Sequence, residues 1–194
     1  MEITTDDTDE IIAGRVQSGD VDSFGELIGH YEAKLKRYAR KFLNYQEDIE
    51  DLVQDVFIKA YTNIQSFDSK QRFSPWIYRI AHNVFVNELK HKQRGGFIFF
   101  DADTVLPHLP AKETTDGAVL DAELKEELDS LLVEIPTKYR EALVLHYLEE
   151  LSYQEISEIL QIPVTTVGVR MNRGRTKLRA CFEAKQLEHN QKLL

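Results

Sequence analysis

Basic and hydroxyl side chains recur at helical spacing along one side of the segment 164–180. The segment contains five basic residues and no acidic one. Arginine and threonine side chains can hydrogen-bond to base edges and phosphates, and an exposed valine can pack on a thymine methyl group. We therefore predict that this face of a helix binds the major groove of DNA. The predicted contact residues are Thr165, Thr166, Val169, Arg170, Arg173 and Lys177.

A second group of residues with nucleic-acid chemistry lies between residues 73 and 94. On a helical wheel, one stripe away from the apolar face contains Trp76, Arg79, Asn83, Val86 and Lys90. Bases can stack on the indole ring, the amide can bind a base edge, and the cations can neutralise phosphates. The stripe is typical of single-stranded nucleic-acid binding. For Trp76 taken alone, ordinary packing is the favoured alternative.

A third group is acidic. Asp48, Asp51 and Asp55 are spaced i, i+3 and i+7, so they share one face of a helix. Either a solvated acidic face or a docking surface for a basic partner explains this spacing. A metal site is not favoured, because no histidine lies at ligand spacing nearby.

Residues 151–178 have the pattern of a helix-turn-helix, the element that would position the first group. The first helix places Ile156, Ile159 and Leu160 on one apolar face. Pro163 cannot continue that helix and is suited to begin the next one. A helix-turn-helix inserts its second helix into the major groove, whereas a plain helical hairpin with a solvated basic face is the alternative. The residues expected on the inner side of the second helix are Val164, Val167, Met171 and Leu178.

Apolar periodicity predicts further helices along the rest of the chain. Ser74 and Pro75 are expected to be the N-cap and first residue of the helix that carries Trp76. A loop is expected from Gln65 to Phe73. The other predicted helices span residues 24–31, 33–43, 46–64, 119–133 and 137–149.

The periodic pattern ends at Gly95-Gly96 and resumes only after about Gly117. The sequence therefore predicts an all-α fold of two small helical domains, residues 1–94 and 119–194, joined by a flexible linker over residues 95–118. The apolar stretch 97–100 within the linker is expected to dock on the chain's own domains or on a partner. No interpretation is assigned to the tail, residues 183–194.

The formal net charge of −9 is unusual for a DNA-binding protein. Phosphate neutralisation supplies most non-specific DNA affinity, so either the charges are segregated or another protein supplies part of the contact. The single cysteine, Cys181, excludes an internal disulfide. The acidic N-terminus is no signal peptide, and no apolar run is long enough to span a bilayer. We expect a cytoplasmic protein without membrane insertion.

Three motifs occur in order: DLVQDVFIKAY at 51–61, FSPWIYRIAHNVFVNELKHKQR at 73–94, and SYQEISEILQIPVTTVGVRMNRGRTKL at 152–178. With this order and spacing, the chain resembles bacterial RNA polymerase sigma factors of the sigma-70 superfamily, extracytoplasmic-function group. The resemblance extends from about residue 11 to residue 179. It implies the second and fourth conserved sigma domains, with no catalytic residue, metal or cofactor.

The resemblance also implies partners. The helix from Asp48 would dock on the β′ clamp helices of core RNA polymerase, and residues 143–148 would pack near the β flap. An anti-sigma factor is a further expected partner. The residues implied in docking on core polymerase are Asp48, Asp51, Gln54 and Asp55.

By the same resemblance, residues 66–72 and the helix from Pro75 would melt the −10 promoter element. Phe67, Ile80 and Asn83 would line a pocket for a flipped base of the non-template strand, with Trp76 and Arg79 beside it. Backbone contacts are implied for Lys90, Lys92 and Arg94.

The second helix of the helix-turn-helix would read the −35 element. Many relatives have Gly-Thr-Val-Lys-Ser at its start, whereas this chain has residues 165–169, TTVGV. Gly168 disfavours helix by up to about 1 kcal/mol relative to alanine, and Val169 replaces a polar residue. The −35 sequence is therefore left open.

The resulting function is that of an alternative sigma factor that binds core polymerase, recognises −10 and −35 elements and opens the strands. A sigma-like decoy that titrates an anti-sigma factor without reaching promoters is the alternative, and a stand-alone regulator is a third. An enzyme is not expected, since no phosphate-binding glycine loop or catalytic constellation occurs.

Overall fold

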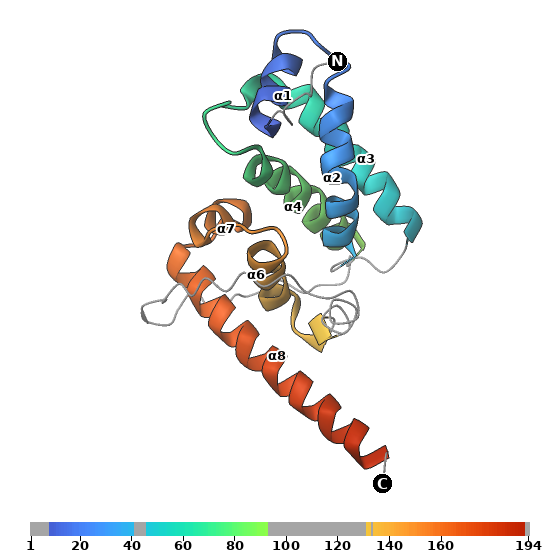
Figure 1. Cartoon of the computed structure of the whole chain (residues 1–194), viewed down its shortest axis with the longest axis vertical. Coiled ribbons are helices and arrows are strands. Elements are labelled where there is room, and N and C mark those ends of the chain that lie inside the picture. The colour runs from blue at the N-terminus through green and yellow to red at the C-terminus, as the bar shows by residue number, and fades with distance from the viewer. Residues whose placement is uncertain (1–7, 41–45, 93–130, 133, 193–194) are drawn as a thin grey trace, which may run out of the picture. The chain divides into compact units, whose positions relative to one another are not determined.

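The computed structural model describes residues 8–40, 46–92, 131–132 and 134–192, and no strand occurs in these ranges (Figure 1). The predicted all-α fold is confirmed. The linker 95–118, the stretch 97–100 and most of the predicted helix 119–133 lie outside the described residues. In chain order the elements are α1 (Asp9–Gln17), α2 (Phe24–Ala39), α3 (Gln46–Asn63), the 3-10 helix η1 (Ile64–Ser66), α4 (Phe73–Lys92), α6 (Thr137–Tyr147), α7 (Tyr153–Leu160) and α8 (Val164–Lys192).

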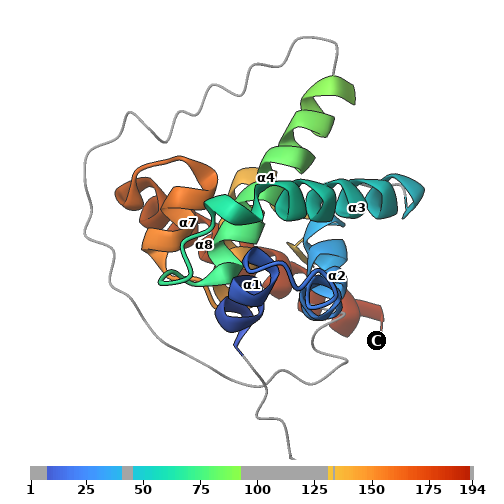
Figure 2. The same cartoon turned by 90° about the horizontal axis from the view of Figure 1, so that it is seen from above.

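Helices α1 to α4 pack together in one of two compact units, and α4 contacts each of the other three (Figure 2). Aromatic side chains occupy the core of this unit. The Tyr38 ring lies 5.4 Å from that of Tyr78 and 5.8 Å from that of Phe85, and all three are buried. Such edge and tilted contacts add to the free energy gained from apolar burial.

Two helix boundaries differ from the prediction. Helix α2 is continuous, where a break was predicted after Tyr31, because Tyr31, Leu35 and Tyr38 continue one buried face through the junction. Helix α4 begins at Phe73, two residues before the predicted first residue Pro75. The Phe73 N–H donates to Glu10 Oε1 at 2.8 Å, so a carboxylate from α1 satisfies a donor of the first turn.

The turn between α1 and α2 is closed by Asp20. Its carboxylate accepts hydrogen bonds from the Ser23 hydroxyl at 2.7 Å and the Ser23 N–H at 3.4 Å. These bonds, the side-chain one foremost, lower the pKa of Asp20 below its ordinary value. Gly19 precedes it with φ of +104°, a backbone conformation that L side chains rarely adopt.

The second unit contains the predicted helix-turn-helix, formed by α7 and α8. A capping box begins α7: Glu155 N–H donates to Ser152 Oγ at 3.3 Å, and Ser152 N–H donates to Glu155 Oε2 at 2.7 Å. Gln161 ends the helix in the left-handed conformation, with φ of 54°. The predicted apolar face of α7 is confirmed as buried: Ile156, Ile159 and Leu160.

Helices α6 and α8 pack closely in this unit. At Gly174 an added Cβ would lie 3.0 Å from Leu143 Cδ1 and 3.4 Å from Tyr139 Cβ, so a larger residue would require these neighbours to shift by a few tenths of an ångström. Helix α8 continues to Lys192 and thus includes most of the tail that the sequence left without interpretation. Within the described ranges, no helix combines the length and apolarity that crossing a membrane requires.

Candidate nucleic-acid interface

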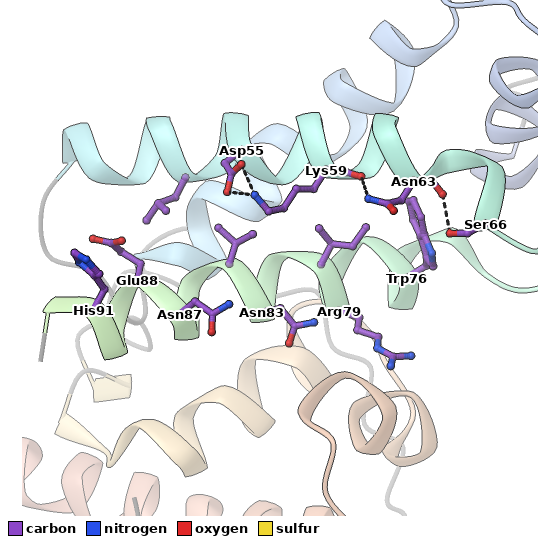
Figure 3. A pocket seen from close by; sticks show the side chains of 13 residues that line it. Asp55, Lys59, Asn63, Ser66, Trp76, Arg79, Asn83, Asn87, Glu88 and His91 are labelled. Atoms are coloured by element: carbon purple, nitrogen blue, oxygen red, sulfur yellow. Dashed lines mark hydrogen bonds and ion pairs between the residues drawn. The ribbon is translucent and has the colours of Figure 1, made fainter. Parts of the chain in front are cut away.

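A groove of about 620 Å³ runs between α3 and α4 in the first unit (Figure 3). Both walls mix apolar and polar side chains, with Ile80 and Val84 among the apolar ones. From α3 and η1 the lining residues are Leu52, Asp55, Lys59, Asn63 and Ser66. From α4 they are Trp76, Arg79, Ile80, Asn83, Val84, Asn87, Glu88 and His91.

Trp76 stands at one end of the groove on an aromatic support. Its ring lies 5.4 Å from Phe67 and 5.4 Å from Phe73, in tilted contacts. Because the ring is packed on this side and also lines the groove, packing and base stacking are compatible for Trp76. Phe67 itself is 5% exposed and is not among the groove-lining residues. Phe67 supports Trp76 from within the core, and its place in a pocket for a flipped base stays a prediction.

The α4 wall carries a polar row. Arg79, Asn83 and Asn87 are spaced by four residues, are all exposed, and project from α4 on the side away from α3 (Figure 3). Ile80 is half-buried in the groove wall. Asn87 was missed by the sequence analysis, although its spacing from Asn83 was available as a signal. The side chains of Lys90 and Lys92, and all of Arg94, lie outside the described residues.

The α3 wall is polar, and its groups bond to one another. Lys59 Nζ donates to both carboxylate oxygens of Asp55, with the longer contact at 2.6 Å. The Asn63 amide donates to the Lys59 carbonyl at 2.8 Å, and the Ser66 hydroxyl donates to the Asn63 carbonyl at 2.7 Å (Figure 3). This wall thus presents one ion pair and two side chains that bond to the backbone.

The loop between η1 and α4 is fastened to α1. The Gln17 amide nitrogen donates to the carbonyls of Ile64 at 2.7 Å and Phe67 at 2.8 Å, spanning η1. Beyond it, Asp68 accepts a hydrogen bond from Lys70 N–H at 3.0 Å and so fixes a turn. The sequence analysis did not find this role of Gln17, because the bonded groups are 47 and 50 residues away.

The acidic stripe lies on the outer side of α3. Asp51 and Gln54 are exposed, and Asp48 and Asp55 are half-buried. Ile58 lies one helical turn beyond Gln54, at the C-terminal end of this polar face, and is 64% exposed. Ile58 was also missed by the sequence analysis. Among the described residues, no group of His, Cys, Asp and Glu side chains could hold a metal ion.

Helix α8 presents a face rotated from the predicted one. Thr166 is only 5% exposed, so placing it on the outer face was wrong, and Arg170, which was expected to flank that face, is 7% exposed. At 100° per residue, both fall within 100° of the buried Val167. Thr165 and Lys177 are exposed, and Val169 and Arg173 are half-exposed. The outer face also includes two exposed residues that the prediction lacked: Asn172 and Thr176.

Comparison with known proteins gives matches to both units. The model of Sigma-70 region 2 matches residues 27–95, and that of Sigma-70, region 4 matches residues 125–178. The chain is 36% identical over 179 residues to the ECF RNA polymerase sigma factor SigW of Bacillus subtilis, covering 85% of this chain and 91% of that protein. It is 35% identical over 174 residues to the ECF RNA polymerase sigma-E factor of Haemophilus influenzae, covering 87% and 92%.

Solved structures show the same similarity. CnrH, solved in complex with the cytosolic domain of CnrY, superposes with a TM-score of 0.66 at 28% identity, covering 92% of this chain and 99% of CnrH. The sigma factor RpoE of Bartonella quintana, solved with the anti-sigma factor NepR, gives a TM-score of 0.62 at 23% identity, covering 82% of this chain and 96% of RpoE. The second match supports the fold alone.

Proposed function

The chain belongs to the extracytoplasmic-function group of the sigma-70 family, and we propose that it binds core RNA polymerase and directs it to promoters by contacts at the −10 and −35 elements. The observation that carries the proposal is the α3–α4 groove, where Trp76, Arg79 and Asn83 combine an aromatic ring, a cation and an amide. These groups stack on a base, neutralise a phosphate and bind a base edge. We place the protein in the cytoplasm, where core polymerase works.

The groove would receive the non-template strand of the opened −10 element. Each stacked step of duplex costs about 1.4 kcal/mol to open, and the sequence contains no nucleotide-binding loop that could couple opening to ATP. Binding of unstacked bases must then supply the free energy. A base held on Trp76 contributes about 1–3 kcal/mol, which offsets one or two steps.

The outer face of α8 would read the −35 element in the major groove. Thr165, Val169 and Arg173 from the predicted set remain candidates, and Asn172 joins them because it is exposed on the same face. Asparagine can bind adenine through two hydrogen bonds. Asn172 therefore adds a side chain that can hydrogen-bond to a base, which neither Gly168 nor Val169 can do.

Docking on core polymerase would use two surfaces. The acidic stripe with Asp51 and Gln54 would meet the β′ clamp helices, with Ile58 as an apolar contact at its C-terminal end. Within residues 143–148, Leu143 and Leu145 are buried, so we propose that the exposed Tyr147 makes the contact with the β flap.

The decoy alternative differs in one outcome. A promoter-directing factor reconstituted with core polymerase selects DNA from a random library and transcribes from it. A decoy binds a partner but yields neither selected DNA nor transcripts. CnrH, at 28% identity, was solved in complex with the cytosolic domain of CnrY, and this similarity supports an anti-sigma factor as a proposed partner in either case.

Asn83→Ala tests the groove on a promoter obtained by that selection. Loss of one amide–base contact, about 1 kcal/mol, should lower the open-complex population about fivefold, measured by permanganate reactivity of −10 thymines. Binding to core polymerase should not change. Asn63→Ala is the matched control, because that amide lines the same groove but bonds to its own helix. Unchanged permanganate reactivity in Asn83→Ala would contradict the assignment.

A further inference from the structure

Lys59 is a cation of the groove that the sequence analysis did not assign. It lies on the α3 wall, across from the α4 row of Arg79 and Asn83. Figure 3 shows its side chain extended along α3 toward Asp55, away from the Trp76 end of the groove. Both partners of the ion pair are about half exposed, 50% for Lys59 and 42% for Asp55. The ammonium group is therefore beside the proposed strand path but directed away from it.

The charges of the groove balance while this pair is intact. Its lining contains two cations, Lys59 and Arg79, and two carboxylates, Asp55 and Glu88. A strand of phosphates thus meets no net attraction from the lining. Asp55 is also the C-terminal carboxylate of the acidic stripe on α3, which extends over about two helical turns from the half-buried Asp48 through the exposed Asp51. One carboxylate is shared by the docking stripe and the groove.

We propose that Lys59 is a phosphate-binding residue of the −10 groove. In the free chain Asp55 pairs with Lys59, and this pairing ends when core polymerase binds Asp55. The inference rests on the proposed function, because it takes the acidic stripe as the polymerase-docking surface and the groove as the strand site. A basic residue of the docked polymerase replaces Lys59 at the Asp55 carboxylate. The freed ammonium then turns toward the groove, whose lining gains one positive charge.

The exchange is accessible because the pair is weak. An exposed i,i+4 ion pair biases its equilibrium only about twofold, since water competes for both charges. Lysine is suited to the exchange: its ammonium has three donors on a flexible four-carbon stem and needs no fixed bidentate geometry. Polymerase docking and strand binding then favour each other. A polymerase cation on Asp55 frees Lys59 for a phosphate, and a phosphate on Lys59 frees Asp55 for the polymerase.

Lys59→Gln in the reconstituted holoenzyme tests the phosphate contact. The probe is a fork-junction DNA with a single-stranded −10 segment, taken from a promoter that the holoenzyme selects, at saturating core polymerase. One phosphate contact to a single strand contributes a slope of about 0.7 in log K against log salt, and hence about fivefold in affinity at 0.1 M salt. Lys59→Gln should therefore lower the salt slope by about 0.7 and the affinity about fivefold, and Lys59→Arg should recover most of the salt slope.

Lys36→Gln is the matched control, because Lys36 forms the same i,i+4 pair with Glu32 on α2, at 2.7 Å, outside the residues that line the groove. It should retain the wild-type slope. A wild-type slope in Lys59→Gln would overturn the inference. If the wild-type chain selects no promoter at all, the proposed function fails instead, so the two failures are distinguishable.

The full chain without polymerase tests the restraint by Asp55. Asp55→Asn should raise affinity for a single-stranded −10 oligonucleotide about twofold at low salt, because Lys59 is released. In a double-mutant cycle the gain should disappear when Lys59→Gln is also present. An equal gain in both backgrounds would show simple charge repulsion by Asp55 and would overturn the exchange. The same cycle at Glu32 and Lys36 should give no gain.

Discussion

Replacing Gln17 with alanine should loosen the loop that precedes α4. The side chain donates two hydrogen bonds, to the carbonyls of Ile64 and Phe67, and both are lost in Gln17→Ala. At about 0.5–1.5 kcal/mol each, the loss is about 1–3 kcal/mol. Higher helix propensity of alanine at the end of α1 returns less than about 0.7 kcal/mol. We expect a net loss near 1.5 kcal/mol in the free energy of unfolding.

The expected change is large enough to measure. For a unit of this size, 1 kcal/mol shifts the melting temperature by about 4–8 °C, so the α1–α4 unit should melt about 6–12 °C lower. Thermal unfolding followed by circular dichroism, with Trp76 fluorescence to report on the unit that contains the groove, measures it. Gln65→Ala is the control, because Gln65 donates a single exposed hydrogen bond, at 3.0 Å to the Gln17 carbonyl. It should cost under about 1 kcal/mol.

Gln17→Glu separates a donor requirement from mere loss of side-chain volume. A carboxylate at neutral pH would face two carbonyl oxygens without a proton to donate, so it should destabilise the unit more than alanine does. Promoter opening should fall in the order wild type, Gln17→Ala, Gln17→Glu at a temperature where all three are folded. The reasoning is refuted if Gln17→Ala unfolds within about 0.5 kcal/mol of the wild type, or if Gln17→Glu is the more stable of the two variants.

Three further predictions concern stability. Gly29→Ala, in open space within α2, should raise the free energy of unfolding by about 0.5–1 kcal/mol, because alanine favours helix. Gly174→Ala should lower it by about 1 kcal/mol, because close contacts with α6 outweigh the same gain in helix propensity, and urea unfolding of the two variants measures both changes. Burial and a neighbouring carboxylate raise the pKa of Tyr31, so stability should be complete below pH about 10 and fall above it, and Tyr31→Phe should lessen that alkaline loss in urea midpoints measured against pH. Ser152→Ala removes the N-cap bond of α7 and should cost about 1 kcal/mol, while Ser157→Ala within the same helix, as a control, should cost less, both measured by thermal unfolding.

Local pattern predicted most of the fold because most of its determinants are local. The period of buried residues in α3 and α7, and the polar row on α4, depend on neighbours three or four positions away. The start of α4 is different. Its first N–H is bonded by Glu10, 63 residues earlier in the chain, and no signal near Phe73 indicates such a partner. The fastening of the preceding loop by Gln17 was unpredictable for the same reason.

The error on α8 has another physical source. The outer face was centred on residues with DNA chemistry, so Thr166 was placed on it and Arg170 at its flank, and both are buried. The inner face of α8 is instead the side that packs on α6, where Gly174 lies against Leu143. Counting from Gly174, Arg170 lies one helical turn away on the same side and is buried. A glycine between arginines was the one local sign of that contact, and it identifies the inner face better than charge does.

The acidic composition acquires a specific consequence in the groove. With Lys59 paired, the charged residues of the groove lining are two cations and two carboxylates, so the lining itself offers a strand stacking and amide contacts but no net electrostatic attraction. Counterion release, which supplies most non-specific affinity, is then small. If docking takes Asp55, the lining becomes net positive only in the holoenzyme. Under the proposed exchange, polymerase docking therefore strengthens strand binding in the groove by the one phosphate contact that Lys59 gains.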